Sequence, residues 1–158
     1  MGIVYKARDN RLGRTVALKF LPPELTRDPE AKDRFFHEAR AASALQHNNI
    51  GVVHEIVETE EGQLFIVMEY YEGETLKKRI SRGVLPIADV VDIVAQAAAG
   101  LARAHKHGII HRDIKPANMM VTPEGVVKIV DFGLAKLSGN TSLTRTGTTV
   151  GTAAYMSP

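Results

Sequence analysis

The chain has 158 residues, 44% of them hydrophobic and 24% charged, and a formal net charge of +2, proportions that exclude a disordered or fibrous protein. It contains no cysteine, which excludes disulfides, thiolate metal sites and a cysteine nucleophile. The charges form no basic stripe, so we expect no nucleic-acid partner, and no apolar run approaches the roughly 18 residues of a membrane span, so we expect no membrane segment in this region.

The first 20 residues predict a β-hairpin. Apolar and polar residues alternate on both sides of the polar break DNRLG, which is typical of two antiparallel strands. Because side chains alternate along a strand, Ala17 and Lys19 should lie on the face opposite Leu18. We therefore expect the ammonium group of Lys19 to leave the core on that face.

A helix is predicted over residues 29–45. Two prolines break the preceding strand, Asp28 is a suitable N-cap, and Pro29 suits the first helical position. Apolar residues follow at spacings of three or four from Phe35 onward, with Glu38 beside this stripe.

The middle of the chain changes from strand patterns to helix patterns. VVHEIVE and QLFIVMEYY, joined at TEEG, predict a second hairpin, and the second of these runs is apolar enough to be covered on both faces. A short helix near residues 75–81 and a long one over residues 86–107 follow, with Gly108 as the C-terminal cap. We place the boundary between two lobes near Glu72.

The last third consists of HRDIKPAN, a brief hairpin that turns at residues 123–125, then DFG and a tail rich in Ser, Thr and Gly. Together with VYKA after Gly2, VALK, the helical Glu38 and GTAAYMSP, these motifs match the protein-kinase signature in order and spacing. The chain therefore resembles the eukaryotic-type serine/threonine protein kinases, and its sequence is most similar to their bacterial branch.

This resemblance covers the whole chain and implies an α+β, two-lobed kinase-like fold truncated at both ends. Residues 1–158 would be a partial kinase domain. Residues 1–71 would form the small lobe without its first strand and most of its glycine-rich loop, and residues 72–158 would form the large lobe through the activation segment, without its later helices. We expect such a fragment to be weakly active or inactive alone.

The resemblance implies ATP and Mg²⁺ as cofactors and transfer of the γ-phosphate to Ser or Thr hydroxyls of proteins. Phosphoryl transfer depends mainly on positioning and charge neutralisation. Asp113 resembles the carboxylate that accepts the hydroxyl proton, and Lys115 would lie near the transferring phosphate. Lys19 resembles the lysine that contacts the α- and β-phosphates and is held in place by Glu38.

Two residues resemble metal ligands. Asn118 and Asp131 would supply the hard oxygen atoms that suit Mg²⁺. The alternative is that Asp113 and Asn118 only satisfy their own turn, which explains neither Lys115 nor the DFG motif. By the same resemblance, the nucleotide pocket should be formed by Gly2, Val4, Ala17, Lys19, Met68, Glu69, Tyr71 and Met120.

The Ser/Thr-rich tail resembles a regulatory activation loop, although a flexible linker is the alternative. A phosphate there could bind Arg112 through charge-assisted hydrogen bonds, and Thr144 and Thr146 are the candidate sites. Thr152 resembles the threonine beside the catalytic aspartate, which favours Ser/Thr specificity. His111 is expected to be structural.

Two other functions stay open, a pseudokinase scaffold and a small-molecule phosphotransferase. The expected partners are ATP and a protein substrate, and we also consider a dimer for trans-autophosphorylation. A cytoplasmic location is expected for the domain, with a membrane anchor elsewhere in the parent protein as an alternative.

Overall fold

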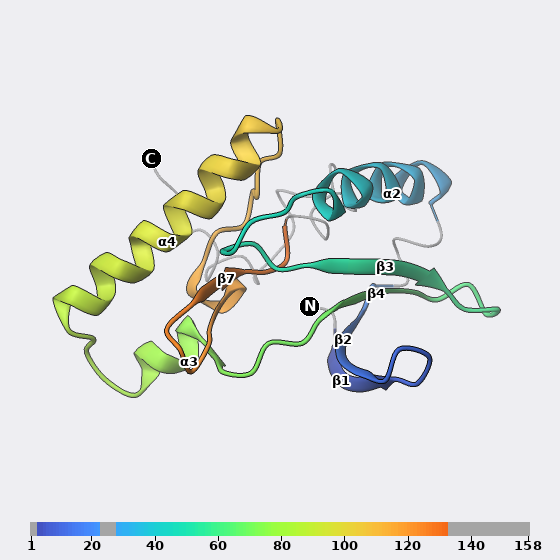
Figure 1. Cartoon of the computed structure of the whole chain (residues 1–158). Coiled ribbons are helices and arrows are strands. Elements are labelled where there is room, and N and C mark those ends of the chain that lie inside the picture. Colours follow the sequence, from blue (N-terminus) through green and yellow to red (C-terminus); the bar gives the residue numbers. More distant parts are fainter. Residues whose placement is uncertain (1–2, 23–27, 133–158) are drawn as a thin grey trace, which may run out of the picture.

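A computed structural model describes residues 3–22 and 28–132. Its elements confirm the predicted hairpins and helices (Figure 1). In chain order they are β1 (Val4–Asp9), β2 (Arg14–Phe20), α2 (Pro29–Ser43), β3 (Val53–Glu58), β4 (Leu64–Glu69), β5 (Glu74–Thr75), α3 (Leu76–Ser81), α4 (Ile87–Lys106), the 3₁₀ helix η1 (Pro116–Asn118), β6 (Met119–Val121) and β7 (Val127–Ile129).

The first four strands form one antiparallel sheet in the order β1-β2-β4-β3, with α2 alongside β3 and β4 (Figure 1). In its register, Lys19 of β2 pairs with Val4 of β1 and with Ile66 of β4. Phe35 and Ala39 of α2 are fully buried against this sheet. The alternation predicted for β2 is therefore confirmed, and one face of the sheet carries Lys19.

Helix α2 begins where its cap was predicted and ends slightly early. The Asp28 carboxylate accepts a hydrogen bond from the Glu30 amide at 3.0 Å, which satisfies one of the unpaired N–H groups at a helix start. The helix ends at Ser43 rather than at residue 45. The Leu45 amide still donates to the Ala42 carbonyl at 3.1 Å, and its side chain joins a second core with Ile50 and Ile129.

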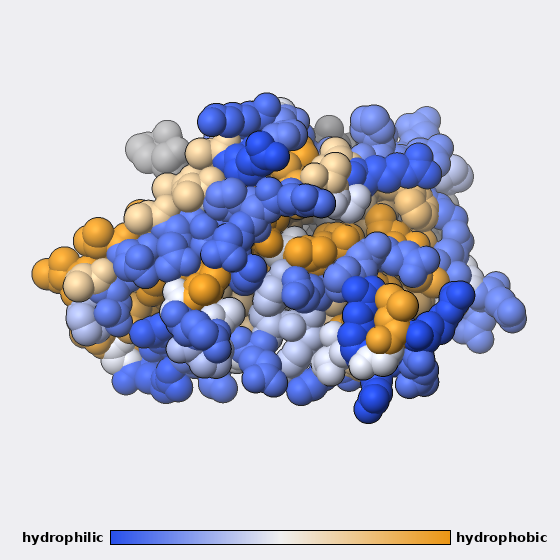
Figure 2. All heavy atoms as spheres, viewed as in Figure 1, coloured by the Kyte–Doolittle hydropathy of each residue, from blue (hydrophilic) through white to orange (hydrophobic). Residues whose placement is uncertain are grey.

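The second sheet has the strand order β5-β6-β7 and is covered by α4. Helix α4 follows Pro86 and ends at Lys106. After the C-cap residue His107, Gly108 adopts a φ of 71°, as its predicted role at the end of the helix requires. One side of α4 is exposed and apolar, with Ile87 82% exposed and Val94 60% exposed. Figure 2 shows hydrophobic residues gathered at the end of the molecule where α4 begins.

The chain passes from the first sheet to the second through residues 70–73, where the predicted boundary near Glu72 falls. A second connection is not covalent. Ile50, which precedes β3, forms a parallel bridge with Ile129 of β7. In the described part of the chain, no helix is both long and apolar enough to cross a membrane.

Candidate active site

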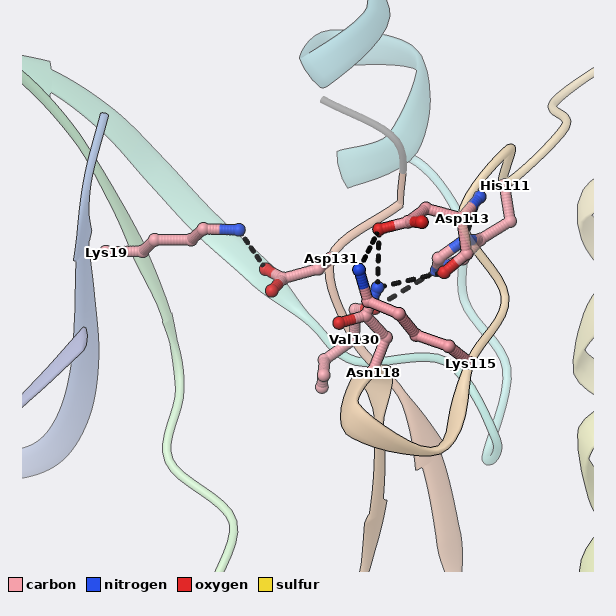
Figure 3. Close-up of polar contacts among 7 residues, drawn as sticks. All are labelled: Lys19, His111, Asp113, Lys115, Asn118, Val130 and Asp131. Atoms are coloured by element: carbon pink, nitrogen blue, oxygen red, sulfur yellow. Dashed lines mark hydrogen bonds and ion pairs between the residues drawn. The ribbon is translucent and has the colours of Figure 1, made fainter. Parts of the chain in front are cut away.

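Lys19 and Asp131 form an ion pair across the two sheets. Lys19 projects from β2, Asp131 follows β7, and Lys19 Nζ lies 2.7 Å from Asp131 Oδ1 (Figure 3). Only 11% of the lysine side chain and 28% of the aspartate side chain are exposed. The strand alternation predicted from sequence thus directs the ammonium group to the carboxylate of the DFG motif.

Asp113 is the centre of a second polar cluster, on the loop between α4 and β6. Lys115 Nζ donates to Asp113 Oδ2 at 2.7 Å, and Asn118 Nδ2 donates to the Asp113 carbonyl oxygen at 2.9 Å and to Oδ2 at 3.2 Å (Figure 3). Pro116 starts the 3₁₀ turn that brings Asn118 back toward Asp113. The eight-residue HRDIKPAN motif therefore places two donors around one carboxylate.

His111 connects this loop to the end of β7. The ring is 1% exposed, and its Nδ1 accepts a hydrogen bond from the Asp113 amide at 3.2 Å. Nε2 therefore carries the proton and donates to the Val130 carbonyl at 3.1 Å. Burial lowers the pKa of His111 below its usual value. The ring, which also packs on Phe132, positions Asp113, in agreement with the structural role predicted for it.

Two non-glycine residues among those described have a positive φ, Arg112 and Asp131, each at 63°. This left-handed conformation costs about 1 to 2 kcal/mol for most residues. Such strain is concentrated at functional sites. One of the two residues, Asp131, belongs to the ion pair with Lys19, and the other, Arg112, directly precedes Asp113 of the second cluster.

A cavity of about 280 Å³ opens beside the Lys19–Asp131 pair. Six of the predicted nucleotide-pocket residues line it, namely Val4, Ala17, Met68, Glu69, Tyr71 and Met120. Lys19 is not among the lining residues, although its ion-pair partner Asp131 is. Gly2 lies outside the described residues.

Sequence reasoning missed part of the lining. Gly51 and Val52 reach the cavity from the segment before β3, and Val130 reaches it from the residue before Asp131. Val130 could have been found, because it directly precedes the DFG motif. Nothing in the local pattern indicates that Gly51 and Val52 approach the cavity, because their position depends on contacts with β7.

Glu38 does not hold Lys19, contrary to our expectation. Its Oε1 lies 3.2 Å from Arg112 Nη1, and Lys19 has its ion pair with Asp131 instead. Glu38 and Arg112 line a separate hollow of about 220 Å³ between α2 and residues 107–112. The packing angle of α2 decides which cation Glu38 meets, and helical spacing along the sequence does not determine this angle. Thr144, Thr146 and Thr152 lie outside the described residues.

The oxygen donors present fit Mg²⁺. Asn118 and Asp131 offer one amide oxygen and one carboxylate, which are hard ligands. Within residues 3–22 and 28–132, no group of three or more His, Cys, Asp or Glu could enclose a metal. A site with few protein ligands suits Mg²⁺, which keeps several waters and shares phosphate oxygens.

The sequence model of the protein kinase domain matches residues 1–158. The chain belongs to the protein kinase domain family. Serine/threonine-protein kinase PknA of Mycobacterium tuberculosis (strain ATCC 25618 / H37Rv) is 44% identical over all of this chain, and PknB of Mycobacterium leprae is 45% identical. This kinase chain spans 38% of the length of PknA and 26% of that of PknB. The predicted bacterial branch is thus confirmed.

Solved structures agree with the kinase fold. The kinase domain of PknI from Mycobacterium tuberculosis superposes with a TM-score of 0.76 at 36% identity. The match covers 85% of this chain and 56% of that one. The predicted α+β, kinase-like fold is confirmed.

Proposed function

We propose that this kinase domain transfers the γ-phosphoryl group of Mg-ATP to Ser or Thr hydroxyls of proteins, as part of a longer protein. The observation that carries the proposal is that Asp131, the ion-pair partner of Lys19, lines the cavity. The neighbouring Val130 amide donates to the Asn118 carbonyl at 2.9 Å, which ties this pair to the cluster around Asp113 (Figure 3). The names of the relatives, all serine/threonine-protein kinases, support the choice of acceptor.

The apolar walls around Ala17 and Met120 suit the adenine ring, because nucleotide pockets are mostly apolar with a few polar groups. Lys19 would bind the α- and β-phosphates. Asn118 and Asp131 would hold Mg²⁺, which when bound neutralises charge on the phosphates.

Asp113 would accept the proton of the substrate hydroxyl as the oxygen attacks the γ-phosphorus. Its backbone amide is already fixed by His111 and its Oδ2 by Lys115, so the carboxylate is oriented before substrate arrives. Lys115 would then stabilise charge on the phosphoryl group in flight. The alternative that Asp113 and Asn118 only satisfy a turn does not account for Lys115 as a third member of the cluster.

Regulation by phosphorylation of Thr144 or Thr146 remains part of the proposal, with Arg112 as the phosphate-binding cation and Thr152 beside Asp113. Trans-autophosphorylation would bring two copies together. A cytoplasmic location is proposed because the domain needs ATP.

The test is radiolabel transfer from γ-labelled ATP by the full-length product of the gene that encodes this chain. Protein acceptors and small hydroxyl compounds are compared, with and without Asp113→Asn. We expect label on Ser and Thr of proteins and a fall of about 10²- to 10⁴-fold in the variant, because a general base contributes this much. Label on small acceptors alone would favour a small-molecule phosphotransferase. ATP binding without transfer would favour a pseudokinase.

A further inference from the structure

Tyr71 lies in the linker between the two sheets, and its hydroxyl makes two hydrogen bonds. The Val52 amide donates to Tyr71 Oη at 2.9 Å, and Oη donates to Glu69 Oε2 at 2.8 Å. Burial raises the pKa of Tyr71 above its usual value, and the hydrogen bond to Glu69 acts in the same direction. The phenol therefore keeps the proton that it donates.

Val52 is itself held by the second sheet, through the residues before it. The Gly51 amide donates to the Ile129 carbonyl at 2.7 Å, and the Ile129 amide donates to the Asn49 carbonyl at 2.9 Å. The approach is close, because a Cβ on Gly51 would lie 3.0 Å from Val130 Cγ1. The Val52 carbonyl also accepts a hydrogen bond from the Glu69 amide of β4 at 3.0 Å, so the residue that binds Tyr71 is tied to β7 as well as to β4.

The ring of Tyr71 also contacts a residue of β7. Lys128 of β7 places its Nζ 5.1 Å from the ring centroid, within the range of a cation–π interaction. Glu69, the other partner of the hydroxyl, is the last residue of β4 in the first sheet. One side chain therefore joins the end of β4, the linker and β7.

We propose that Tyr71 is a positioning residue, whose side chain fixes the linker against β7 and thereby sets the width of the nucleotide cavity. The proposal rests on the function proposed above. Glu69 and Tyr71 line one edge of the cavity, and Asp131 lines it from the residues just after β7. β7 contains Lys128 and is followed two residues later by Asp131. The contacts of Tyr71 with Lys128 and Val52 therefore determine the distance between the linker and the Asp131 carboxylate.

The neighbouring Tyr70 provides a matched control. Its ring lies under Lys6, with Nζ 4.3 Å from the ring centroid. Its hydroxyl has no hydrogen bond to the described residues, in contrast to that of Tyr71. Tyr71→Phe and Tyr70→Phe therefore remove the same atom from adjacent positions, and only the first removes an inter-element contact.

The first measurement is amide hydrogen exchange at Val52 in the nucleotide-free protein. Loss of a hydrogen bond of about 1 kcal/mol speeds exchange about fivefold, so we expect at least this change in Tyr71→Phe. Tyr70→Phe should leave the exchange of Val52 unchanged. Equal exchange in wild type and Tyr71→Phe would overturn the proposal. This readout needs no catalysis, so it still tests the proposal if the protein transfers no phosphate.

The second measurement is steady-state kinetics with the full-length protein. Tyr71→Phe should raise KM for ATP about three- to tenfold and leave KM for the protein substrate unchanged. Lys128→Met, which removes the cation and keeps the hydroxyl, should raise KM for ATP less. A lower kcat with an unchanged KM for ATP would mean only a smaller active fraction, which would contradict a positioning role.

Discussion

Glu38 of α2 forms an ion pair with Arg112 of the HRD motif, with Oε1 and Nη1 3.2 Å apart. The pair joins α2 to the loop that carries Asp113. Both side chains are partly exposed, Glu38 at 37% and Arg112 at 51%. In this conformation Glu38 binds the same arginine to which we assign a regulatory phosphate.

Because both side chains are partly exposed, we expect the Glu38–Arg112 ion pair to contribute little to the free energy of unfolding. Glu38→Gln should change the free energy of unfolding by less than about 1 kcal/mol, as for other exposed ion pairs. If Glu38 reaches Lys19 during turnover, the variant should lower phosphoryl transfer well beyond its effect on stability. Urea unfolding and transfer assays measure the two quantities. Glu30→Gln, on the first turn of the same helix, should alter neither, and a large loss of stability in Glu38→Gln would contradict the prediction.

Lys19→Met should weaken Mg-ATP binding. The substitution removes the cation that faces Asp131 and the proposed phosphate position, and a hydrogen bond to a charged group contributes about 1.5 to 3 kcal/mol, so affinity should fall about tenfold or more. Isothermal titration measures the change. Lys32→Met, which breaks an ion pair between α2 and Glu58 at the end of β3, removes a cation that does not line the cavity and should bind nucleotide like wild type. Equal affinities for both variants would show that Lys19 does not contact the nucleotide.

Stability should fall at acidic pH because of His111. Its pKa is lowered in the folded protein, so below about pH 6.5 the unfolded chain binds more protons than the folded one. The stabilisation is complete above that pH and is lost as the pH falls toward the folded pKa. Protonation at Nδ1 would also break the hydrogen bond from the Asp113 amide.

Chemical unfolding between pH 5 and 8 checks this. His111→Gln should lose part of the slope of stability against pH. His54, whose pKa is also lowered by burial, remains in both proteins and accounts for slope that the variant retains. An unchanged slope would show that His111 does not titrate as inferred.

Gly73→Ala should disrupt the second sheet. Gly73 has a φ of 128°, and a Cβ there would overlap the Val121 carbonyl and lie 3.0 Å from Thr122 Cα. Steric overlap and backbone strain together should cost about 3 kcal/mol or more. Gly13→Ala is the control, because its φ is 67° and the space around it is open, so only about 1 to 2 kcal/mol of strain applies. Thermal unfolding that ranks the two variants equally would argue against the overlap.

Local patterns predicted the elements well. Alternation along β2 placed Ala17 and Lys19 on the face that meets the cavity and Asp131, and Asp28 marked the start of α2. Such features depend on residues within a few positions of each other, so they can be read before any packing is known.

The motif spacing likewise placed Asp113, Lys115 and Asn118 within six residues, and the 3₁₀ turn that Pro116 starts brings Asn118 back to the Asp113 carboxylate. Only the tertiary structure decided that Glu38 meets Arg112 and that Tyr71 joins β4 to β7. Apart from the contact between Tyr71 and Glu69, these contacts link residues far apart along the chain. The packing angles of helices and sheets, which depend on the summed burial of many side chains, decide which of several chemically suitable partners lies within reach.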